Sequence, residues 1–262
     1  MYTHGHHESV LRSHRWRTVE NSARYVIPHL RPGLDLLDIG CGPGSITADF
    51  AGRLAPGNVC GIDPSSDVIA AAQRDHPGVA FAIGDVYHLA FEDASWDVVH
   101  AHQVLQHLTD PVAALKEMRR VVRPGGIVAA RDSDYATFTW HPENERFVRW
   151  LTLYREIARS NGGEPDAGRQ LRSWAQRAGF AHIVTSASAW CFATPEERAW
   201  WGGLWAERMT ASAIARQAIR DGRATQVDLN EMADAWRTWA AAEDGWFAVL
   251  HGEIVCTRDR AE

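Results

Sequence analysis

Three glycines and two acidic residues in the first half of the chain have the types and spacing of a nucleotide-like binding site. Gly40, Gly42 and Gly44 follow an apolar run in the segment Leu-Leu-Asp-Ile-Gly-Cys-Gly-Pro-Gly. Glycines just beyond a strand end let the backbone turn tightly and let a ligand approach it closely. Asp63 and Asp85 close the next two apolar runs. The first carboxylate can accept both hydroxyls of a ribose, and the second can accept from an adenine amino group. Together the five residues predict an adenosine site.

Each of these residues also has a plainer interpretation. A glycine triplet alone can be a turn, and Asp63, which precedes Pro64-Ser65-Ser66, can cap a helix. Three such coincidences at consecutive strand ends are less common than one shared site. We therefore favour ligand binding.

The segment His100 to His107 offers candidates for proton transfer. His100 and His102 share one face of a strand because side chains alternate with a period of two. His102 or His107 could act as a general base, since imidazole titrates near neutral pH. Packing in the sheet or hydrogen bonding to the backbone is the alternative for either one. No metal site is predicted, because His100 and His102 lack a third ligand at a suitable spacing.

The elements that must position these residues alternate between strand and helix. The strand-like segments are short, rich in Val, Ile, Leu and Ala, and cover 34–39, 58–63, 79–85, 96–102 and 126–132. A helix is predicted from Pro111, with Asp110 as its N-cap, to a stop at Pro124. Alternation of this kind specifies a parallel sheet with helices on both faces. A further helix is predicted over 13–30.

The second half of the chain has a different composition. Ten of the twelve tryptophans follow Phe138. Helical stretches are predicted over 143–160, 168–178 and 195–245, with strands at 182–192 and 246–257. If both late strands join the sheet, residues 194–245 are a helical cap inserted into one domain, 33–262. Residues 1–32 are then an N-terminal helical segment over the ligand site.

The tryptophan-rich region has two interpretations. Tyr135, Trp140 and Trp205 could line a pocket for an apolar ligand. Alternatively most tryptophans are packing residues, as the three-residue spacing of Trp236 and Trp239 on one helix face indicates.

Composition and charge exclude several classes of protein. The 27 Lys and Arg against 33 Asp and Glu give a net charge of −6, whereas a nucleic-acid binder usually carries a basic excess. No apolar run approaches the roughly 20 residues that span a bilayer. We therefore expect a cytoplasmic protein, monomeric or homodimeric, with no nucleic-acid or membrane partner. The four cysteines stand singly, which argues against a disulfide framework. His4, His6 and His7 are interpreted as part of a tail.

Four motifs recur in an order that resembles one enzyme family. They are Asp38 to Gly44, Gly61-Ile62-Asp63, Gly84-Asp85-Val86 and Val121 to Gly126. This set resembles the class I S-adenosylmethionine-dependent methyltransferases over roughly residues 15 to 135. It looks closest to the branch typified by ubiquinone and menaquinone biosynthesis and by many natural-product enzymes that methylate small molecules.

The resemblance implies an α/β fold with a Rossmann-like, seven-stranded, mostly parallel sheet whose last strand is antiparallel. It implies S-adenosylmethionine as cofactor and S-adenosylhomocysteine as product, with Asp63 on the ribose and Asp85 and Val86 around the adenine. The predicted cofactor residues are Asp38, Gly40, Cys41, Gly42, Gly44, Asp63, Pro64, Asp85, Val86, His102 and Gln103.

The glycine spacing supports this choice over a dinucleotide site. It is GxGxG here, whereas a pyrophosphate site usually shows GxGxxG. We predict a methyltransferase with a small, apolar or aromatic acceptor, whose O, N or C atom stays open. The alternatives are an enzyme of the same fold with non-methylating chemistry, a nicotinamide-dependent oxidoreductase, and a non-catalytic binding subunit.

Overall fold

The computed structural model describes residues 8–260, which divide into two compact units. The strand unit contains 14–133, 167–188 and 251–260, and the tryptophan unit contains 8–13, 134–166 and 189–250. His4, His6 and His7 lie outside the described residues. No helix of the described chain is both long and apolar enough to cross a membrane.

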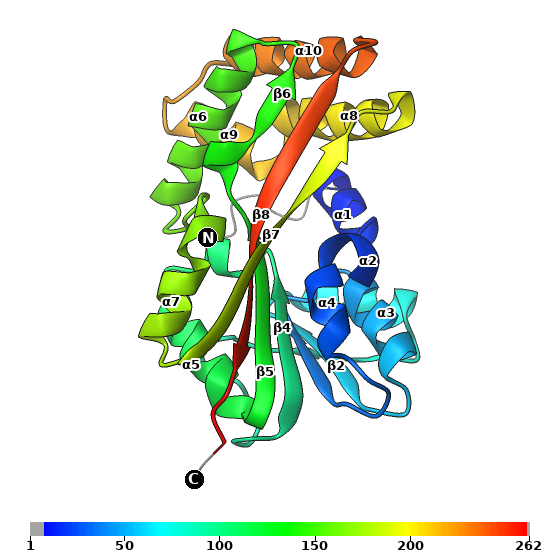
Figure 1. Ribbon diagram of the computed structural model, residues 1–262. Coiled ribbons are helices and arrows are strands. Elements are labelled where there is room, and N and C mark those ends of the chain that lie inside the picture. Colours follow the sequence, from blue (N-terminus) through cyan, green and yellow to red (C-terminus); the bar gives the residue numbers. More distant parts are fainter. Residues whose placement is uncertain (1–7, 261–262) are drawn as a thin grey trace. The chain divides into compact units, whose positions relative to one another are not determined.

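The strand unit is built on a mostly parallel sheet (Figure 1). Its parallel strands run in the order β3-β2-β1-β4-β5, and β8 pairs antiparallel with β5. Their bounds are β1 (Leu36–Ile39), β2 (Val59–Asp63), β3 (Ala80–Ile83), β4 (Trp96–His102), β5 (Val122–Ser133) and β8 (Trp246–Thr257). The predicted fold class and the antiparallel last strand are confirmed. Parallel pairing brings the carboxyl ends of β1 to β5 to one edge of the sheet.

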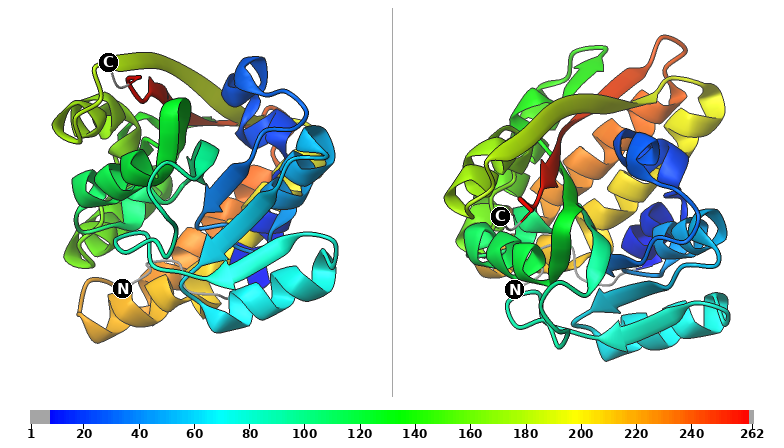
Figure 2. Two further views of the ribbon diagram at one scale, coloured as in Figure 1. Left: turned by 90° about the horizontal axis from the view of Figure 1, so that it is seen from below. Right: turned by 60° about the horizontal axis from the view of Figure 1, so that its bottom comes forward.

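Helices cover both faces of this sheet, as the view from below in Figure 2 shows. Helices α3 (Ser45–Leu54) and α4 (Ser66–Asp75) lie on one side, and α5 (Pro111–Val121) and α7 (Leu171–Arg177) on the other. Asp110 caps α5 as predicted, because its Oδ1 accepts the N–H of Ala113 at 2.9 Å. The helix ends at Val121, and the Pro-Gly-Gly predicted to stop it lies inside β5.

The single helix predicted over 13–30 is wrong. The segment forms α1 (Glu8–Arg15), α2 (Val19–Ser22) and the 3-10 helix η1 (Arg24–His29). Thr18 starts α2 with a capping box, in which its side chain accepts the N–H of Asn21 and its own N–H donates to Asn21 Oδ1. A capping residue has non-helical backbone angles, so a strong cap inside the predicted helix divides it.

The tryptophan unit contains four longer helices and a three-residue strand. These are α6 (Glu145–Ser160), α8 (Pro195–Ala211), α9 (Ala213–Arg220), α10 (Gln226–Ala241) and β6 (Thr139–His141). Ser212 and Thr225 cap α9 and α10 and so divide the stretch predicted to be helical over 195–245. Strand β7 (His182–Phe192) has the predicted bounds and pairs with β8. Because β6 also pairs with β8, the sheet of the described chain has eight strands where seven were expected.

Most tryptophans of the second half are packing residues, as one of the two interpretations held. Trp236 and Trp239 are both at most 2% exposed and share one aromatic core with Phe147 and Phe247. Trp246, by contrast, is 39% exposed. The buried rings contact one another mainly edge to face or tilted, which is the favourable geometry for aromatic quadrupoles.

Candidate active site

The loop after β1 needs its three glycines for different reasons. Gly40, Gly42 and Gly44 have φ of +63°, +55° and +84°, a region that disfavours side chains. A Cβ on Gly40 would lie 2.5 Å from Val104, and one on Gly44 would lie 2.6 Å from Phe81. A Cβ on Gly42 would meet only Nδ1 of His14, at an ordinary 3.7 Å. The loop therefore presents open backbone at Gly42, where packing does not exclude a side chain.

Asp63 lies beside this loop at the end of β2. Its Oδ2 accepts the N–H of Gly42 at 3.3 Å, and its Oδ1 accepts the N–H of Ser65 at 3.0 Å. The N-cap of α4 is Ser65, whose Oγ accepts the N–H of Val68 at 3.4 Å. Helix capping therefore does not account for Asp63, and its half-buried carboxylate faces the bare part of the glycine loop. Pro64, next in the chain, is exposed.

The end of β3 is held next to the end of β2. The N–H of Gly84 donates to the carbonyl of Asp63 at 3.2 Å. Asp85 is exposed, and its Oδ1 accepts the N–H of Tyr87 at 2.9 Å. Val86 is 9% exposed and packs in the core of the strand unit. The structure thus brings together the carboxyl ends of β1, β2 and β3, as the sequence predicts.

Asp38 lies under the glycine loop, buried inside the strand unit. Its Oδ2 accepts from Oγ1 of Thr47 at 2.6 Å, and its Oδ1 lies 2.8 Å from Nδ1 of His100. These contacts join β1 to α3 and to β4, so Asp38 holds the start of α3 relative to the two strands. In the loop itself, burial raises the pKa of Cys41, so its thiol stays protonated and unreactive. Among the described residues no group of three or more His, Cys, Asp and Glu side chains is placed to hold a metal ion.

Both predicted catalytic histidines are neutral at neutral pH. Burial, and then the positive charge of Arg17, lowers the pKa of His102 well below its ordinary value and that of His107 to about 3. An imidazole with so low a pKa binds a proton weakly. The assignment of either residue as a general base stays a prediction.

Gln103 adopts a strained backbone conformation, with φ of +55°. Its N–H donates to the carbonyl of Arg131 at 2.7 Å, and its Oε1 accepts from Arg17 at 2.6 Å. Its amide nitrogen lies 2.8 Å from Oγ of Ser133 and 2.9 Å from Nε2 of His251. A left-handed residue other than glycine costs about 1–2 kcal/mol and persists only where its surroundings fix it. Here four contacts, to the N-terminal segment, β5 and β8, fix it.

Sequence reasoning missed a cluster of buried polar side chains at the end of β5. Arg131 and Asp132 are at most 1% exposed, and Nε of Arg131 lies 3.2 Å from Oε1 of Glu253 on β8. Ser186 and Ser188 of β7 donate to the same carboxylate. Burial lowers the pKa of Arg131 to about 10 and raises that of Asp132 to about 7. The signal that could have found them is two adjacent charges closing the otherwise apolar run Ile-Val-Ala-Ala-Arg-Asp.

The three residues predicted to bind the acceptor belong to the core of the tryptophan unit, whereas all predicted cofactor residues belong to the strand unit. Tyr135 stacks on Phe138 and Tyr154, with ring centroids 4.3 and 4.0 Å away. Trp140 is partly buried. Trp205 is 1% exposed, and the guanidinium of Arg208 lies 4.9 Å from its ring centroid. Their role toward an acceptor stays a prediction.

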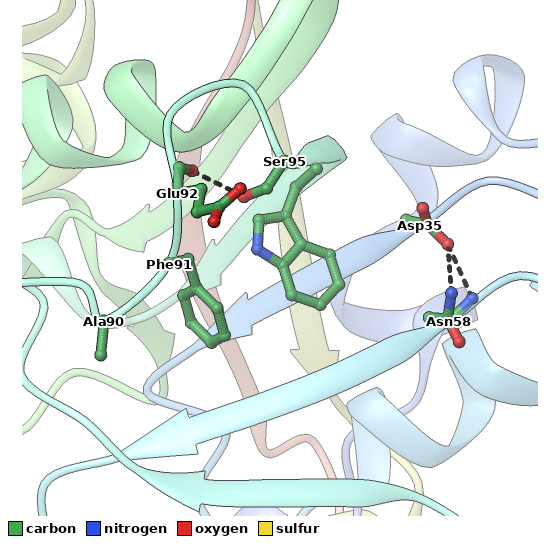
Figure 3. Close-up of a pocket in the computed structure, with 7 residues that line it drawn as sticks. Asp35, Asn58, Ala90, Phe91, Glu92 and Ser95 are labelled. Carbon is green, nitrogen blue, oxygen red and sulfur yellow. Dashed lines mark hydrogen bonds between the residues drawn. The ribbon is translucent and has the colours of Figure 1, made fainter.

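A pocket of about 420 Å³ lies at the opposite edge of the sheet from the glycine loop. Asp35, Asn58 and Trp96 precede or begin β1, β2 and β4, and Phe91 and Glu92 complete much of the lining (Figure 3). Both polar atoms that Asp35 offers are used, since Asn58 and Arg123 donate to them. The pocket is therefore separate from the predicted cofactor residues, which lie at the carboxyl ends of the strands.

Known proteins resemble this chain in sequence and in fold. The family model described as a methyltransferase domain matches residues 37–130. An uncharacterized methyltransferase of Schizosaccharomyces pombe is 34% identical, over 98% of this chain and 96% of its own length. A demethylmenaquinone methyltransferase of Beutenbergia cavernae is 29% identical, over 72% of this chain and 75% of its own.

Among solved structures, phosphoethanolamine N-methyltransferase 2 of Haemonchus contortus, in complex with phosphomonomethylethanolamine and S-adenosylhomocysteine, has the same fold. The TM-score is 0.56 at 19% identity, and the match covers 90% of this chain and 52% of that one. The match to the Schizosaccharomyces pombe methyltransferase covers nearly its whole length. The geometry around the glycine loop is consistent with the same family. The chain belongs to the class I S-adenosylmethionine-dependent methyltransferases.

Proposed function

We propose that this methyltransferase acts on a small molecule with an apolar or aromatic body. We also propose that the ends of β1, β2 and β3 hold its cofactor. The observation that carries the cofactor site is the carboxylate of Asp63 beside the open backbone of Gly42. Two observations support the acceptor class. The net charge of −6 does not suit a nucleic-acid substrate, and one relative is named for demethylmenaquinone.

The residues at this edge fit S-adenosylmethionine. In this proposal Asp63 accepts ribose hydroxyls, Asp85 accepts the adenine amino group, and the loop from Gly40 to Gly44 lies beside the methionine part. The two acids Asp63 and Asp85 lie at the end of β2 and just after the end of β3, which suits a ligand with a cationic sulfur and no phosphate.

When bound, S-adenosylmethionine supplies an electrophilic methyl group on a positively charged sulfur. The protein has to hold the acceptor in line with that methyl group and keep water away. Because His102 and His107 bind protons weakly, we expect an acceptor atom that needs no strong base.

Isothermal titration with S-adenosylhomocysteine tests the cofactor site. We expect binding to the unaltered protein and roughly tenfold or greater weakening in Asp63→Asn, because a charge-assisted hydrogen bond contributes about 1.5–3 kcal/mol. Asp67→Asn is the matched control, since Asp67 is an exposed acid four residues further on, in α4. Its affinity should equal that of the unaltered protein.

Three results would decide against parts of the proposal. Absence of binding, or equal binding by Asp63→Asn, rejects the assigned site. Binding of NADH in place of S-adenosylhomocysteine indicates a nicotinamide enzyme. Turnover without formation of S-adenosylhomocysteine indicates non-methylating chemistry on the same fold.

A further inference from the structure

Asp132 is a buried carboxylate at the edge of the sheet where the cofactor residues lie, and no sequence motif accounts for it. Its Oδ1 accepts the N–H of Gln106 at 3.1 Å. Its Oδ2 is buried and has no hydrogen-bond partner among the described residues. In return, Oε1 of Gln106 accepts the N–H of Ser133 at 3.2 Å, so β5 and the loop after β4 hold each other by two opposed bonds.

The loop held in this way is the segment 103–107, which carries two of the residues predicted from sequence, Gln103 and His107. Asp132 contacts it at Gln106, and the strained backbone of Gln103 is tied to the same strand through Arg131 and Ser133. The 3-10 helix η2 (Leu105–His107) begins between these two anchors. The position of the loop therefore depends on the end of β5.

The segments packed around Asp132 enclose its carboxyl group. Asp132 pairs across the sheet with Gly252, so the two residues point to the same face. A Cβ on Gly252 would lie 2.1 Å from the carbonyl oxygen of Gly168, just before which the 3-10 helix η4 (Ala167–Gln170) begins. The missing side chain at Gly252 thus lets η4 close over the site of Asp132.

An asparagine could accept the same N–H without a buried charge, yet the chain has an aspartate. A charged acceptor binds backbone N–H groups about twice as strongly as a neutral one. Resting on the proposed function, we propose that Asp132, in its ionised form, is the positioning residue that fixes the loop 103–107 for cofactor binding.

Burial disfavours the ionised form of Asp132 and brings its ionisation close to neutral pH. Burial raises the pKa of Asp132 to about 7, against the lowering effect of the N–H groups of Gln106 and Leu105 and of the charges of Arg131 and Arg17. The other titratable groups on the elements around it include His100 and His102 of β4, His107, Arg169, and His251 and Glu253 of β8. His102 and His107 stay neutral through this range. The ionised fraction of Asp132 therefore grows between about pH 6 and pH 8.

Ionisation of Asp132 lowers the stability of the fold, although in this proposal it favours ligand binding. The carboxyl of the unfolded chain ionises near its ordinary value of 3.8, and that of the folded chain only near 7. The folded state therefore holds an extra proton between these values, and Asp132 lowers stability as pH rises toward 7. Asp132→Asn, which removes the buried charge, should raise the melting temperature at pH 8 while weakening ligand binding.

The test measures S-adenosylhomocysteine affinity from pH 6 to 8.5 together with the melting temperature. We expect the affinity of the unaltered protein to rise several-fold across one ionisation near pH 7, and Asp132→Asn to stay at the low-pH value throughout. Hydrogen exchange at pH 8 should show weaker protection of the amides in 103–107 in this variant. Asp132→Ala, which also removes the acceptor oxygen, should lower both affinity and stability.

Asp35→Asn is the control because it should show the reverse pattern. The N–H of Asn58 holds the pKa of Asp35 below its ordinary value, so its charge stabilises the fold, at the opposite edge of the sheet. Its loss should lower the melting temperature and leave affinity and its pH profile unchanged. The inference is overturned if the protein binds S-adenosylhomocysteine and Asp132→Asn keeps both the affinity and the pH profile. If the unaltered protein does not bind at all, the proposed cofactor site fails as well.

Discussion

The glycines of the loop after β1 are needed for different reasons. Some are required by packing within the protein, and Gly42 is open to a ligand. Gly44 is closed in by Phe81, whereas Gly42 meets only a distant atom of His14. An added methyl group at Gly42 therefore strains the backbone but collides with nothing in the protein. A ligand that approaches the loop would meet that methyl group.

We accordingly expect Gly42→Ala to lose at least tenfold in S-adenosylhomocysteine affinity while its stability falls by only about 1–2 kcal/mol, the cost of the left-handed conformation. Gly52→Ala is the control, because Gly52 lies in α3, an added Cβ there would have open space, and alanine has the higher helix propensity. Titration calorimetry and thermal melting measure the two effects. Equal affinities in the two variants would contradict a ligand at this loop.

The buried imidazole of His107 makes a prediction about acid stability. Its pKa is about 3 in the folded protein and near 6.5 in the unfolded chain, so the unfolded state binds the extra proton between these values. Stability from this residue is complete above pH 6.5 and is lost as pH falls toward 3. Between pH 7 and pH 4.5, the free energy of unfolding, measured with denaturant, should fall by about 2 kcal/mol less in His107→Gln than in the unaltered protein. His88→Gln, at a ring that is 87% exposed, is the matched control variant.

Among the elements, β5 and β8 are joined by a buried ion pair, to which β7 adds hydrogen bonds from Ser186 and Ser188. Glu253→Gln removes the negative charge that faces the buried guanidinium of Arg131, and breaking a buried ion pair typically costs about 3–5 kcal/mol. We expect that loss in Glu253→Gln, and partial recovery when Arg131→Met is added. Asp234→Asn, which breaks the exposed pair with Arg237, should change stability by less than about 1 kcal/mol. Urea unfolding measures the unaltered protein, these three variants and Arg131→Met alone, and additive effects of the two core substitutions would show that the pair is not coupled.

The bounds of elements were predictable where local pattern decides them. Strands β4, β7 and β8 have the predicted ends, because each is a segment rich in strand-forming residues and bounded by turn or polar residues. The break before α2 was not predicted, since the capping box of Thr18 and Asn21 overrides an apolar periodicity that continues through it. Strand β6 was missed because three residues carry too little pattern and form a strand only through β8.

The residues of the candidate site also differ in how far the local sequence predicts them. The glycine loop and Asp63 could be found from sequence, since their function follows from residue type at a strand end. For Asp132 the sequence offers only a charge at the end of the apolar run Ile-Val-Ala-Ala-Arg-Asp. The burial of that charge depends on Gly252 and Gly168, which are far from it in the chain and close over it only in the fold.

At the scale of the whole molecule, intrinsic fluorescence and circular dichroism observe different units. All tryptophans except Trp16, Trp96 and Trp174 belong to the tryptophan unit, whereas the parallel sheet belongs to the strand unit. Because β8 supplies residues to both units, we expect fluorescence and far-ultraviolet circular dichroism to report coincident unfolding transitions. S-adenosylhomocysteine should shift both midpoints upward together. Two separate transitions, with only the dichroism midpoint moved by the ligand, would show that the units unfold independently.

The place of β8 in the sequence determines when β5 can gain its partner during synthesis. As the ribosome delivers the protein, β1 to β5 are made early, but the partner of β5 consists of residues 251–257 and emerges after the whole tryptophan unit. Until then the apolar strand β5 has an open edge in the nascent protein, and open edges pair with other chains. A slow or interrupted translation of the later segments therefore prolongs the period in which the newborn enzyme can aggregate, and chaperones that cover strand edges would act in that period.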